Sequence, residues 1–252
     1  MTPTDRLTAT AVLRAAGARV RRAPHLVAPF ALAGLVVALA DWLRRYDPIP
    51  AATPDWVGRT LSIQYSIFPQ GTARTVRPVG GLLDLRTPYL VGSVALELVV
   101  VLAVGLAGWA TITRALGTER RVGSLARYLG VLSAIAIAPR LLGTPSVDVE
   151  SVLLGVPLVV AFSLVLVHLF ALPGLLATGR GFPTALAASA RRSRGRRWPL
   201  FWLVVVFGVA SWGLARVPMA GGFLSTALVG PIHAVSLAVL VERTEPPSRS
   251  DE

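Results

Sequence analysis

The chain contains no cysteine, no lysine and no asparagine among its 252 residues. Without cysteine it forms neither disulfide bonds nor thiolate metal sites. Without asparagine it lacks the N-x-[ST] acceptor of N-glycosylation. Lysine and asparagine codons are rich in A and T, so we attribute both absences to a GC-rich prokaryotic genome. All 25 basic residues are arginine.

Charge is also scarce. Charged residues make up 15% of the chain, against ~25% in ordinary soluble domains. Hydrophobic residues make up 54%, and the mean hydropathy is +0.64. The apolar stretches each approach the ~20 residues of a bilayer crossing, and they cover 26–43, 89–110, 122–142, 151–177, 198–215 and 223–241. The sequence therefore predicts an all-α polytopic bundle of six transmembrane helices.

The arginines predict an orientation, because cytoplasmic loops are enriched in positive charge. Seventeen arginines fall on one side of the six stretches and eight on the other, and six of those eight lie in the long loop 44–88. We therefore expect a multi-pass cell-membrane protein with both termini in the cytoplasm. The expected organisation is a basic N-terminal segment 1–25, a membrane domain 26–241 with outer loop 44–88, and a disordered tail 242–252.

Two features of the N-terminal part leave alternatives open. Ala38-Leu39-Ala40 resembles a signal-peptide cleavage site, although the basic leader before the first stretch is long for that role. Residues 5–22 combine arginines with a weak apolar face and end before Pro24. They form either a short helix on the cytoplasmic leaflet or a basic disordered tail.

The loop 44–88 carries a period-two pattern, in which Leu61, Ile63, Tyr65 and Ile67 alternate with polar residues. This pattern predicts a half-buried strand. Pro69-Gln70-Gly71 predicts a turn, and 75–77 can return as a second strand. We expect a hairpin-like element that packs on the outer helix ends, because a lone hairpin is marginal in water.

Aromatic side chains favour the headgroup zone of a bilayer, where a ring has one apolar and one wet end. The expected outer-border residues are Trp42, Tyr46 and Tyr89, and the expected inner-border residues are Trp109, Tyr128, Trp198 and Trp202.

Glu97 is the main candidate for an intramembrane site, because it lies about eight residues, ~12 Å, into the second stretch. An ionisable residue at that depth is a functional candidate. Ser93 shares its helix face at i, i+4 spacing. In the last stretch, His233 is expected at a similar depth in the membrane. Glu97 and His233 can therefore pair, and Arg140 and Arg216 are alternative partners for Glu97. Such a pair serves either as a structural contact or as a site for a proton or polar solute.

The remaining polar candidates are weaker. His168 stands among Val, Leu and Phe with no acidic or second histidine residue at i+3 or i+4, so it predicts a packing residue and no metal site. Walker, zincin and nucleophile-elbow motifs are missing, and we expect neither an enzyme nor a cofactor. The expected anionic-headgroup site is a basic cytoplasmic loop formed by Arg191, Arg192, Arg194, Arg196 and Arg197.

The last third of the chain contains Leu172-Pro173, the segment Pro183-Thr184-Ala185-Leu186-Ala187-Ala188-Ser189, then Arg197-Trp198-Pro199-Leu200-Phe201 and Gly230-Pro231-Ile232-His233-Ala234-Val235. This part resembles the six-helix membrane-anchor domain of glycerophosphoryl diester phosphodiesterases and related uncharacterised prokaryotic membrane families. The resemblance implies the membrane architecture alone, because the phosphodiesterase catalytic domain has no counterpart here. A weaker likeness to the coupling loop of ABC-importer permeases rests on Ala187-Ala188-Ser189, but the glutamate of that loop is missing.

Two functions are compatible with these features. The first is a non-enzymatic scaffold or membrane-organising protein that binds anionic lipid headgroups and a membrane-protein partner or a second copy of itself, with no nucleic acid involved. The alternative is a permease or transporter subunit for a small solute that uses Glu97 and His233.

Overall fold

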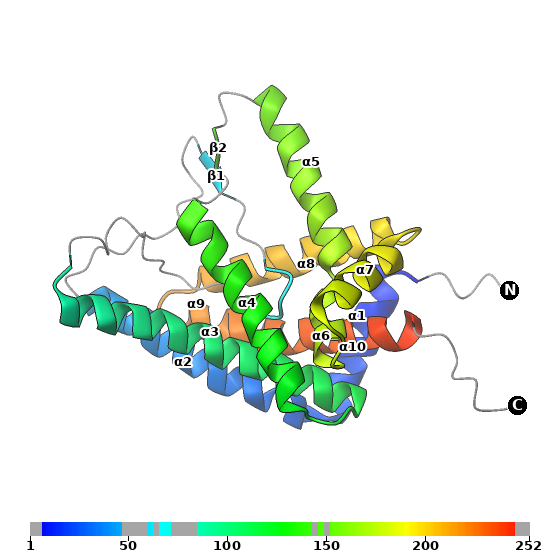
Figure 1. Cartoon of the computed structure of the whole chain (residues 1–252), viewed down its shortest axis with the longest axis horizontal. Helices are drawn as coiled ribbons and strands as arrows, with labels where there is room; N and C mark the ends of the chain where they lie inside the picture. The colour runs from blue at the N-terminus through cyan, green and yellow to red at the C-terminus, as the bar shows by residue number, and fades with distance from the viewer. Residues whose placement is uncertain are drawn as a thin grey trace, which may run out of the picture.

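The computed structural model describes residues 7–46, 60–62, 66–71, 85–142, 146–148 and 152–244 (Figure 1). Within these ranges nearly all of the chain is helical. The helices are α1 (Ala9–Arg22), α2 (Ala28–Tyr46), α3 (Thr87–Leu116), α4 (Val122–Leu142), α5 (Val152–Leu169), α6 (Leu172–Ala177), α7 (Phe182–Ser193), α8 (Arg197–Ala215), α9 (Gly221–Leu224) and α10 (Gly230–Thr244). A 3₁₀ turn, Pro24–Leu26, precedes α2, and a π-helical segment, Ser225–Val229, joins α9 to α10.

Five helical segments in the described part are long and apolar enough to cross a membrane, which agrees with a multi-pass membrane protein. They are Pro24–Tyr46, Thr87–Leu116, Val160–Ala177, Arg197–Ala215 and Gly221–Thr244. Five of the six predicted stretches therefore have a counterpart of sufficient length. The apolar part of α4, Val122–Ile137, is shorter. A crossing by this sixth helix stays a prediction.

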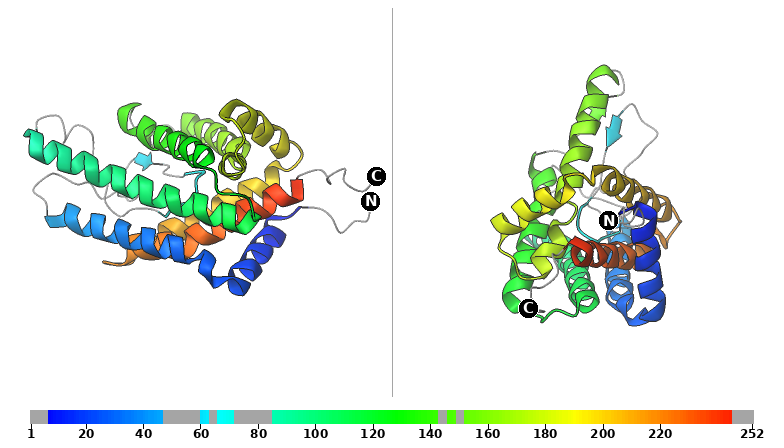
Figure 2. Two further views of the ribbon diagram at one scale, coloured as in Figure 1. Left: turned by 60° about the horizontal axis from the view of Figure 1, so that its bottom comes forward. Right: turned by 90° about the vertical axis from the view of Figure 1, so that its right-hand side faces the viewer.

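We name the two ends of the helical bundle after the elements that lie there. At the α1 end, α1 meets the last turn of α10 and the end of α3 (Figure 2). At the sheet end, two three-residue strands lie near the start of α5 (Figure 1). Fifteen of the arginines in the described part belong to segments at the α1 end, which is the basic side expected from the sequence.

The centre of the bundle is the last span, Gly221–Thr244, whose most apolar window is 83% buried. It packs against α2, α3, α6 and α8. Close approach depends on small residues, as in other membrane bundles: a Cβ on Gly230 would lie 2.4 Å from the ring of Phe30. In contrast, α5 leans away from the bundle at its sheet end (Figures 1 and 2).

The expected hairpin within loop 44–88 does not describe the strand pairing that is observed. The strand β1 (Thr60–Ser62) pairs antiparallel with β2 (Ser146–Asp148), which belongs to the connection between α4 and α5. The expected return strand at 75–77 lies outside the described residues. The strand that pairs with β1 in the described part therefore comes from another loop, and the return strand of the hairpin stays a prediction.

Residues 66–71 of the same loop enter the bundle. Ile67 and Phe68 are 2% and 1% exposed, and the Phe68 ring packs edge-on against Tyr128 of α4 at 4.9 Å between centroids. Non-helical backbone at such a position is tolerated in a membrane domain only where protein or a polar cavity surrounds it. We call 66–71 the re-entrant segment. The sequence predicted that this part of the loop packs on the outer ends of the helices.

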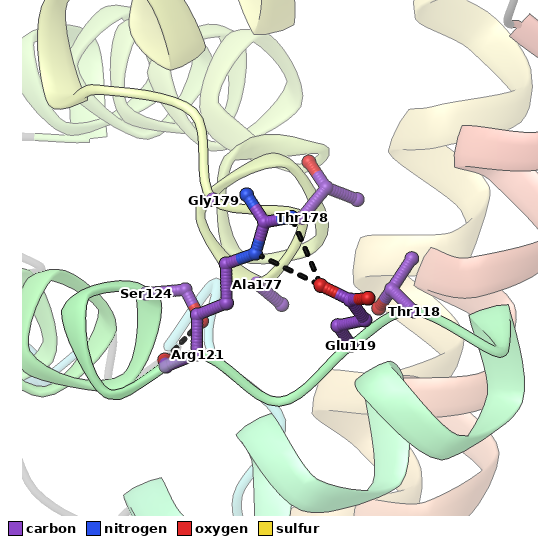
Figure 3. A pocket seen from close by; sticks show the side chains of 7 residues that line it. All are labelled: Thr118, Glu119, Arg121, Ser124, Ala177, Thr178 and Gly179. Atoms are coloured by element: carbon purple, nitrogen blue, oxygen red, sulfur yellow. Dashed lines mark hydrogen bonds and ion pairs between the residues drawn. The ribbon is translucent and has the colours of Figure 1, made fainter.

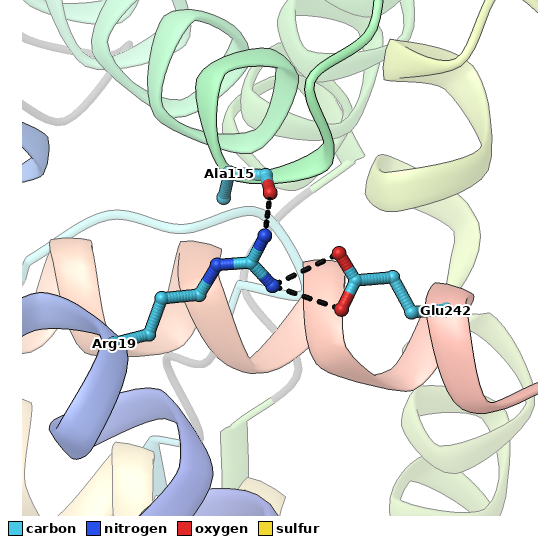
Figure 4. A network of polar contacts seen from close by, with 3 residues as sticks. All are labelled: Arg19, Ala115 and Glu242. Atoms are coloured by element: carbon cyan, nitrogen blue, oxygen red, sulfur yellow. Dashed lines mark hydrogen bonds and ion pairs between the residues drawn. The ribbon is translucent and has the colours of Figure 1, made fainter. Parts of the chain in front are cut away.

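The N-terminal segment forms a helix, as one of the two interpretations proposed, but α1 contacts protein. Val12 and Ala16 are fully buried against the bundle, and α1 packs on α10 and α8. Arg19 donates hydrogen bonds to both carboxylate oxygens of Glu242, at 2.9 and 2.8 Å, and to the carbonyl of Ala115 (Figure 4). Residues 242–244, which were expected in a disordered tail, are helical, since α10 continues to Thr244.

The aromatic residues divide between the expected borders and the interior. Trp42, Tyr46 and Tyr89 are 51%, 74% and 52% exposed near the sheet end, and Trp198 and Trp202 are exposed near the α1 end. Trp109 and Tyr128 were expected at a border, but both are buried. The Trp109 indole nitrogen donates to the Ser124 hydroxyl at 3.1 Å, which joins α3 to α4.

Candidate functional site

The strongest polar cluster in the membrane-spanning part joins α2 and α3 through three charged residues. The guanidinium of Arg44 contacts the Glu97 carboxylate, with Nη2 and Nε at 2.6 and 2.9 Å from Oε1. Arg44 Nη1 lies 3.1 Å from Asp41 Oδ1. The three side chains are 2%, 12% and 6% exposed for Arg44, Glu97 and Asp41. We call these three residues the ion cluster.

The backbone geometry explains how the cluster forms. Asp41 and Arg44 are three residues apart on α2, so both project from one face of that helix. Glu97 faces them from α3, the helix most extensively packed on α2. Gly222 of α9 closes the third side, because a Cβ there would lie 2.6 Å from Asp41 Oδ2. A glycine at 222 therefore lets the backbone of the last span approach the carboxylate.

Glu97 was predictable from the sequence as an intramembrane candidate, but neither of its partners was. Asp41 lay unremarked inside the first apolar stretch, and Arg44 was counted as a flanking positive charge. The available signal was the i, i+3 spacing of Asp41 and Arg44, which matches an intrahelical ion pair. Ser93, expected on the same face as Glu97, is 2% exposed and donates to the carbonyl of Tyr89 at 2.7 Å.

His233 lies at a different level from Glu97. Arg19 bridges Ala115 and Glu242, so these two residues mark one level at the α1 end. At 1.5 Å per residue, Glu97 lies about 27 Å from that level along α3, whereas His233 lies about 14 Å from it along α10. The expected equal depth is therefore wrong by roughly 13 Å, and the ion pair that the structure shows for Glu97 is with Arg44.

The surroundings of His233 are aromatic. Its ring stacks on Phe207 at 4.5 Å and on Phe170 at 5.4 Å between centroids, with interplanar angles of 16° and 20°. The imidazole of the central span thus contacts the turn that follows α5 and the middle of α8. The two phenyl rings also stack on each other, at 6.5 Å between centroids, so the three rings form one aromatic cluster in which the imidazole has a structural role.

The other sequence candidates occupy separate places. His168 Nδ1 lies 2.6 Å from the carbonyl of Leu164 in its own helix, which agrees with a packing role. The Arg216 guanidinium lies 3.9 Å from the centre of the Trp212 ring, a cation–π contact. The side chain of Arg140 lies outside the described residues. Among the described residues, no group of three or more His, Asp or Glu side chains is arranged to hold a metal ion.

A second polar region surrounds the re-entrant segment. A Cβ on Gly71 would lie 2.3 Å from the backbone nitrogen and 2.5 Å from Oγ1 of Thr226. Thr226 belongs to the π-helical segment, and such segments are frequent at functional sites. Deeper in the bundle, a Cβ on Gly108 would lie 2.5 Å from the Tyr128 hydroxyl and 3.7 Å from the Pro69 carbonyl oxygen. The loop therefore runs between α3, α4 and the last span.

The expected headgroup site is formed by the end of α7 and the start of α8. Ala185, Ala188 and Ser189 of α7 are buried against neighbouring helices, and Ser189 donates to the carbonyl of His168 at 2.6 Å. This contact fixes the helix to α5. Of the five arginines that follow Ser189, Arg191, Arg194 and Arg197 are exposed, whereas Arg192 and Arg196 are half-buried. Gly195 turns the chain between them with a φ of 77°, a conformation that glycine adopts without strain.

Aromatic rings adjoin these arginines. Trp198 is 69% exposed, and its ring packs on Phe201 at 5.5 Å and on Trp202 at 6.2 Å between centroids. At the other end of α8, about 21 Å away at helical rise, Trp212 carries Arg216. The helix is therefore bracketed by aromatic and arginine side chains, which is the pattern of a span that ends at two headgroup layers. We call Arg191, Arg194, Arg197 and Trp198 the basic aromatic face.

A small cavity of about 210 Å³ also opens at the α1 end, between the α3–α4 and α6–α7 turns (Figure 3). Arg121 and Glu119 beside it form an ion pair at 2.9 Å, and both side chains are largely exposed. Backbone and short polar groups provide most of the remaining lining. Solvent screens such a pair, so the cavity offers little electrostatic selectivity.

Comparison of the chain with protein-family models, with curated proteins and with solved structures gave no significant match.

Proposed function

We propose that this protein is a non-enzymatic, multi-pass membrane protein that binds anionic phospholipid headgroups on its basic aromatic face and thereby organises the surrounding membrane. The observation that carries the proposal is that three exposed arginines and the exposed ring of Trp198 lie within eight consecutive residues, 191–198. Arginine binds phosphate oxygens, and each basic residue near an anionic surface contributes ~1 kcal/mol. An indole beside them favours the same interfacial depth.

The proposal includes a cytoplasmic α1 end and six spans. The excess of arginines at that end supports the orientation, and the length of α4 supports the sixth crossing. The likeness of the last third to membrane-anchor domains of glycerophosphoryl diester phosphodiesterases supports a role that needs no catalytic residues. A membrane-protein partner or a second copy of the chain is a further part of this proposal.

Lipid retention by the purified protein tests it. Replacing Arg191, Arg194 and Arg197 by glutamine removes about 3 kcal/mol of attraction, so we expect the affinity for a short-chain phosphatidylglycerol to fall about 100-fold. The matched control replaces three exposed arginines of α1, Arg14, Arg21 and Arg22, by glutamine. Native mass spectrometry or a fluorescence titration in a neutral detergent measures both variants.

The control distinguishes a specific lipid site from general attraction by net charge, because the two variants have the same net charge. Selective loss in the α7–α8 variant supports the proposal. An equal loss in both variants means that net charge alone attracts the lipid, and unchanged binding in the α7–α8 variant contradicts the site. Phosphatidylcholine of equal chain length measures the contribution of the acyl chains.

A second candidate function, a permease or transporter subunit for a small solute, is favoured by a different observation. Ionisable groups at membrane depth and non-helical backbone inside a bundle are features of solute pathways. Here the ion cluster contacts Gly222, and the re-entrant segment contacts Thr226 one helical turn further along the same span. In this candidate Glu97 acts with Arg44, in place of the His233 partner expected from the sequence.

A further inference from the structure

Among the buried hydroxyl groups of the bundle, two that border the re-entrant segment have no hydrogen-bond partner among the described residues. They are Tyr128 Oη and Thr226 Oγ1, on residues that are 0% and 1% exposed. A buried hydroxyl without a partner is costly, and most such groups in native proteins are satisfied by protein or by ordered water. Each of the two therefore requires an explanation.

Both hydroxyls border the re-entrant segment. The Tyr128 hydroxyl and the Pro69 carbonyl oxygen face the same point above Gly108. The Thr226 hydroxyl lies against Gly71, two residues further along the loop. Two extended residues cover at most ~7 Å. The two hydroxyls therefore lie at the two ends of one short stretch of loop backbone, residues 69–71.

We infer that Tyr128, Thr226 and the re-entrant segment form an uncharged internal site that binds small neutral hydrogen-bonding molecules, water first among them. A hydroxyl both donates and accepts, and a carbonyl accepts, so the lining matches a ligand that can do both. Water bridges groups of this kind in protein interiors, typically with about three hydrogen bonds.

The charges nearest to the site in the described structure explain why a neutral ligand fits better than an ion. The ion cluster contacts Gly222, four residues before Thr226, so it lies about 6 Å away along the span. Its guanidinium already contacts two carboxylates. The hydroxyl region itself is lined by uncharged groups, so an ion there would have no charged group in direct contact with it.

Together with the ion cluster, the site forms a row of polar groups through the bundle. The ion cluster, the hydroxyl of Thr226 and the hydroxyl of Tyr128 follow one another from the sheet end toward the α1 end. Glycine makes room at each level, at positions 222, 71 and 108, where a Cβ would lie 2.6, 2.3 and 2.5 Å from the nearest polar atom. Bound water at the hydroxyls would continue the hydrogen bonding that begins at the ion cluster. This inference holds with either function proposed above.

Hydroxyl-radical footprinting of the full-length protein in detergent or nanodiscs tests the inference, because radicals formed from bound water label adjacent side chains. We expect Tyr128 to be modified at least about tenfold faster than Phe30, a ring that is equally buried in apolar surroundings. Exposed Tyr89 gives the upper reference. Labelling of Tyr128 as slow as that of Phe30 overturns the inference.

Two conservative variants provide an independent readout, and neither inserts a clash. Tyr128→Phe and Thr226→Val remove one hydroxyl each. If the hydroxyls are bonded to bound water, each variant lowers the midpoint of thermal unfolding, and Thr226→Val also slows labelling of Tyr128. If they are dry and unpaired, each variant leaves the midpoint unchanged or raises it, because a buried unsatisfied group disappears. That second result contradicts the inference.

Discussion

Replacing Arg44 by methionine tests whether the ion cluster holds α2 against α3. The substitution leaves the carboxylates of Asp41 and Glu97 buried without the guanidinium that contacts both at 3.1 and 2.6 Å. At an effective dielectric constant of 20, one pair of unit charges about 4 Å apart attracts by roughly 4 kcal/mol. We expect the free energy of unfolding to fall by about 3–5 kcal/mol.

Reversible unfolding in mixed detergent micelles measures this change. The matched control is Arg45→Met, which removes the same charge from the adjacent, exposed position and is expected to change the stability by less than about 1 kcal/mol. A triple variant, Asp41→Asn, Arg44→Met and Glu97→Gln, is expected to recover most of the loss, because it leaves no buried charge uncompensated. Equal stabilities of the Arg44 and Arg45 variants would refute the structural role of the cluster.

The milder variant Glu97→Gln separates the two proposed functions. Its amide oxygen still accepts a hydrogen bond from Arg44, so the expected loss of stability is about 1 kcal/mol, the difference between a charged and a neutral hydrogen bond. In the scaffold proposal, this variant binds anionic lipid as well as the wild type. In the permease candidate, it abolishes solute flux in proteoliposomes while the protein stays folded.

Two further predictions concern close contacts elsewhere in the bundle. Gly222→Val forces a side chain into the position 2.6 Å from Asp41 Oδ2, so we expect a loss of about 1–3 kcal/mol by overpacking, measured by the same unfolding assay, whereas Gly213→Val, at an open position, is the control. Arg19→Gln removes the ion pair with Glu242. The two side chains are 35% and 43% exposed, so we expect the free energy of global unfolding to fall by less than about 1 kcal/mol. Faster amide hydrogen exchange confined to α1 would show its local release, and unchanged exchange would contradict the anchoring role of Arg19.

Much of the architecture was readable from the sequence because its signal is local. A run of apolar residues between polar loops is enough to indicate a membrane-spanning helix, and four of the five apolar segments long enough to cross a membrane begin within two residues of the predicted stretches. Hydropathy could not show that the last span lies at the centre. Its apolar character resembles that of lipid-facing helices, and burial depends on which neighbours pack around it.

The polar site was only partly predictable, since it depends on contacts between distant segments. Glu97 was found because an acidic residue inside an apolar run is conspicuous. Arg44 was predicted to lie in the outer loop. However, α2 continues to Tyr46, and the Arg44 side chain is buried in the bundle. The turn residues around Pro69 gave the correct local signal for non-helical backbone, but nothing local indicated that this backbone enters the bundle.

The polar interior and the basic aromatic face depend on different residues. An apolar core of similar volume would be at least as stable as one that carries a buried ion cluster and two buried hydroxyls. Here glycine accommodates a polar group at each of three levels, and a larger residue would collide with it. Lipid binding at Arg191, Arg194 and Arg197 requires none of this, because those side chains lie outside the packed bundle. A variant that weakens lipid binding without altering the labelling of Tyr128 would therefore show that the two regions act independently, as their positions in the fold imply.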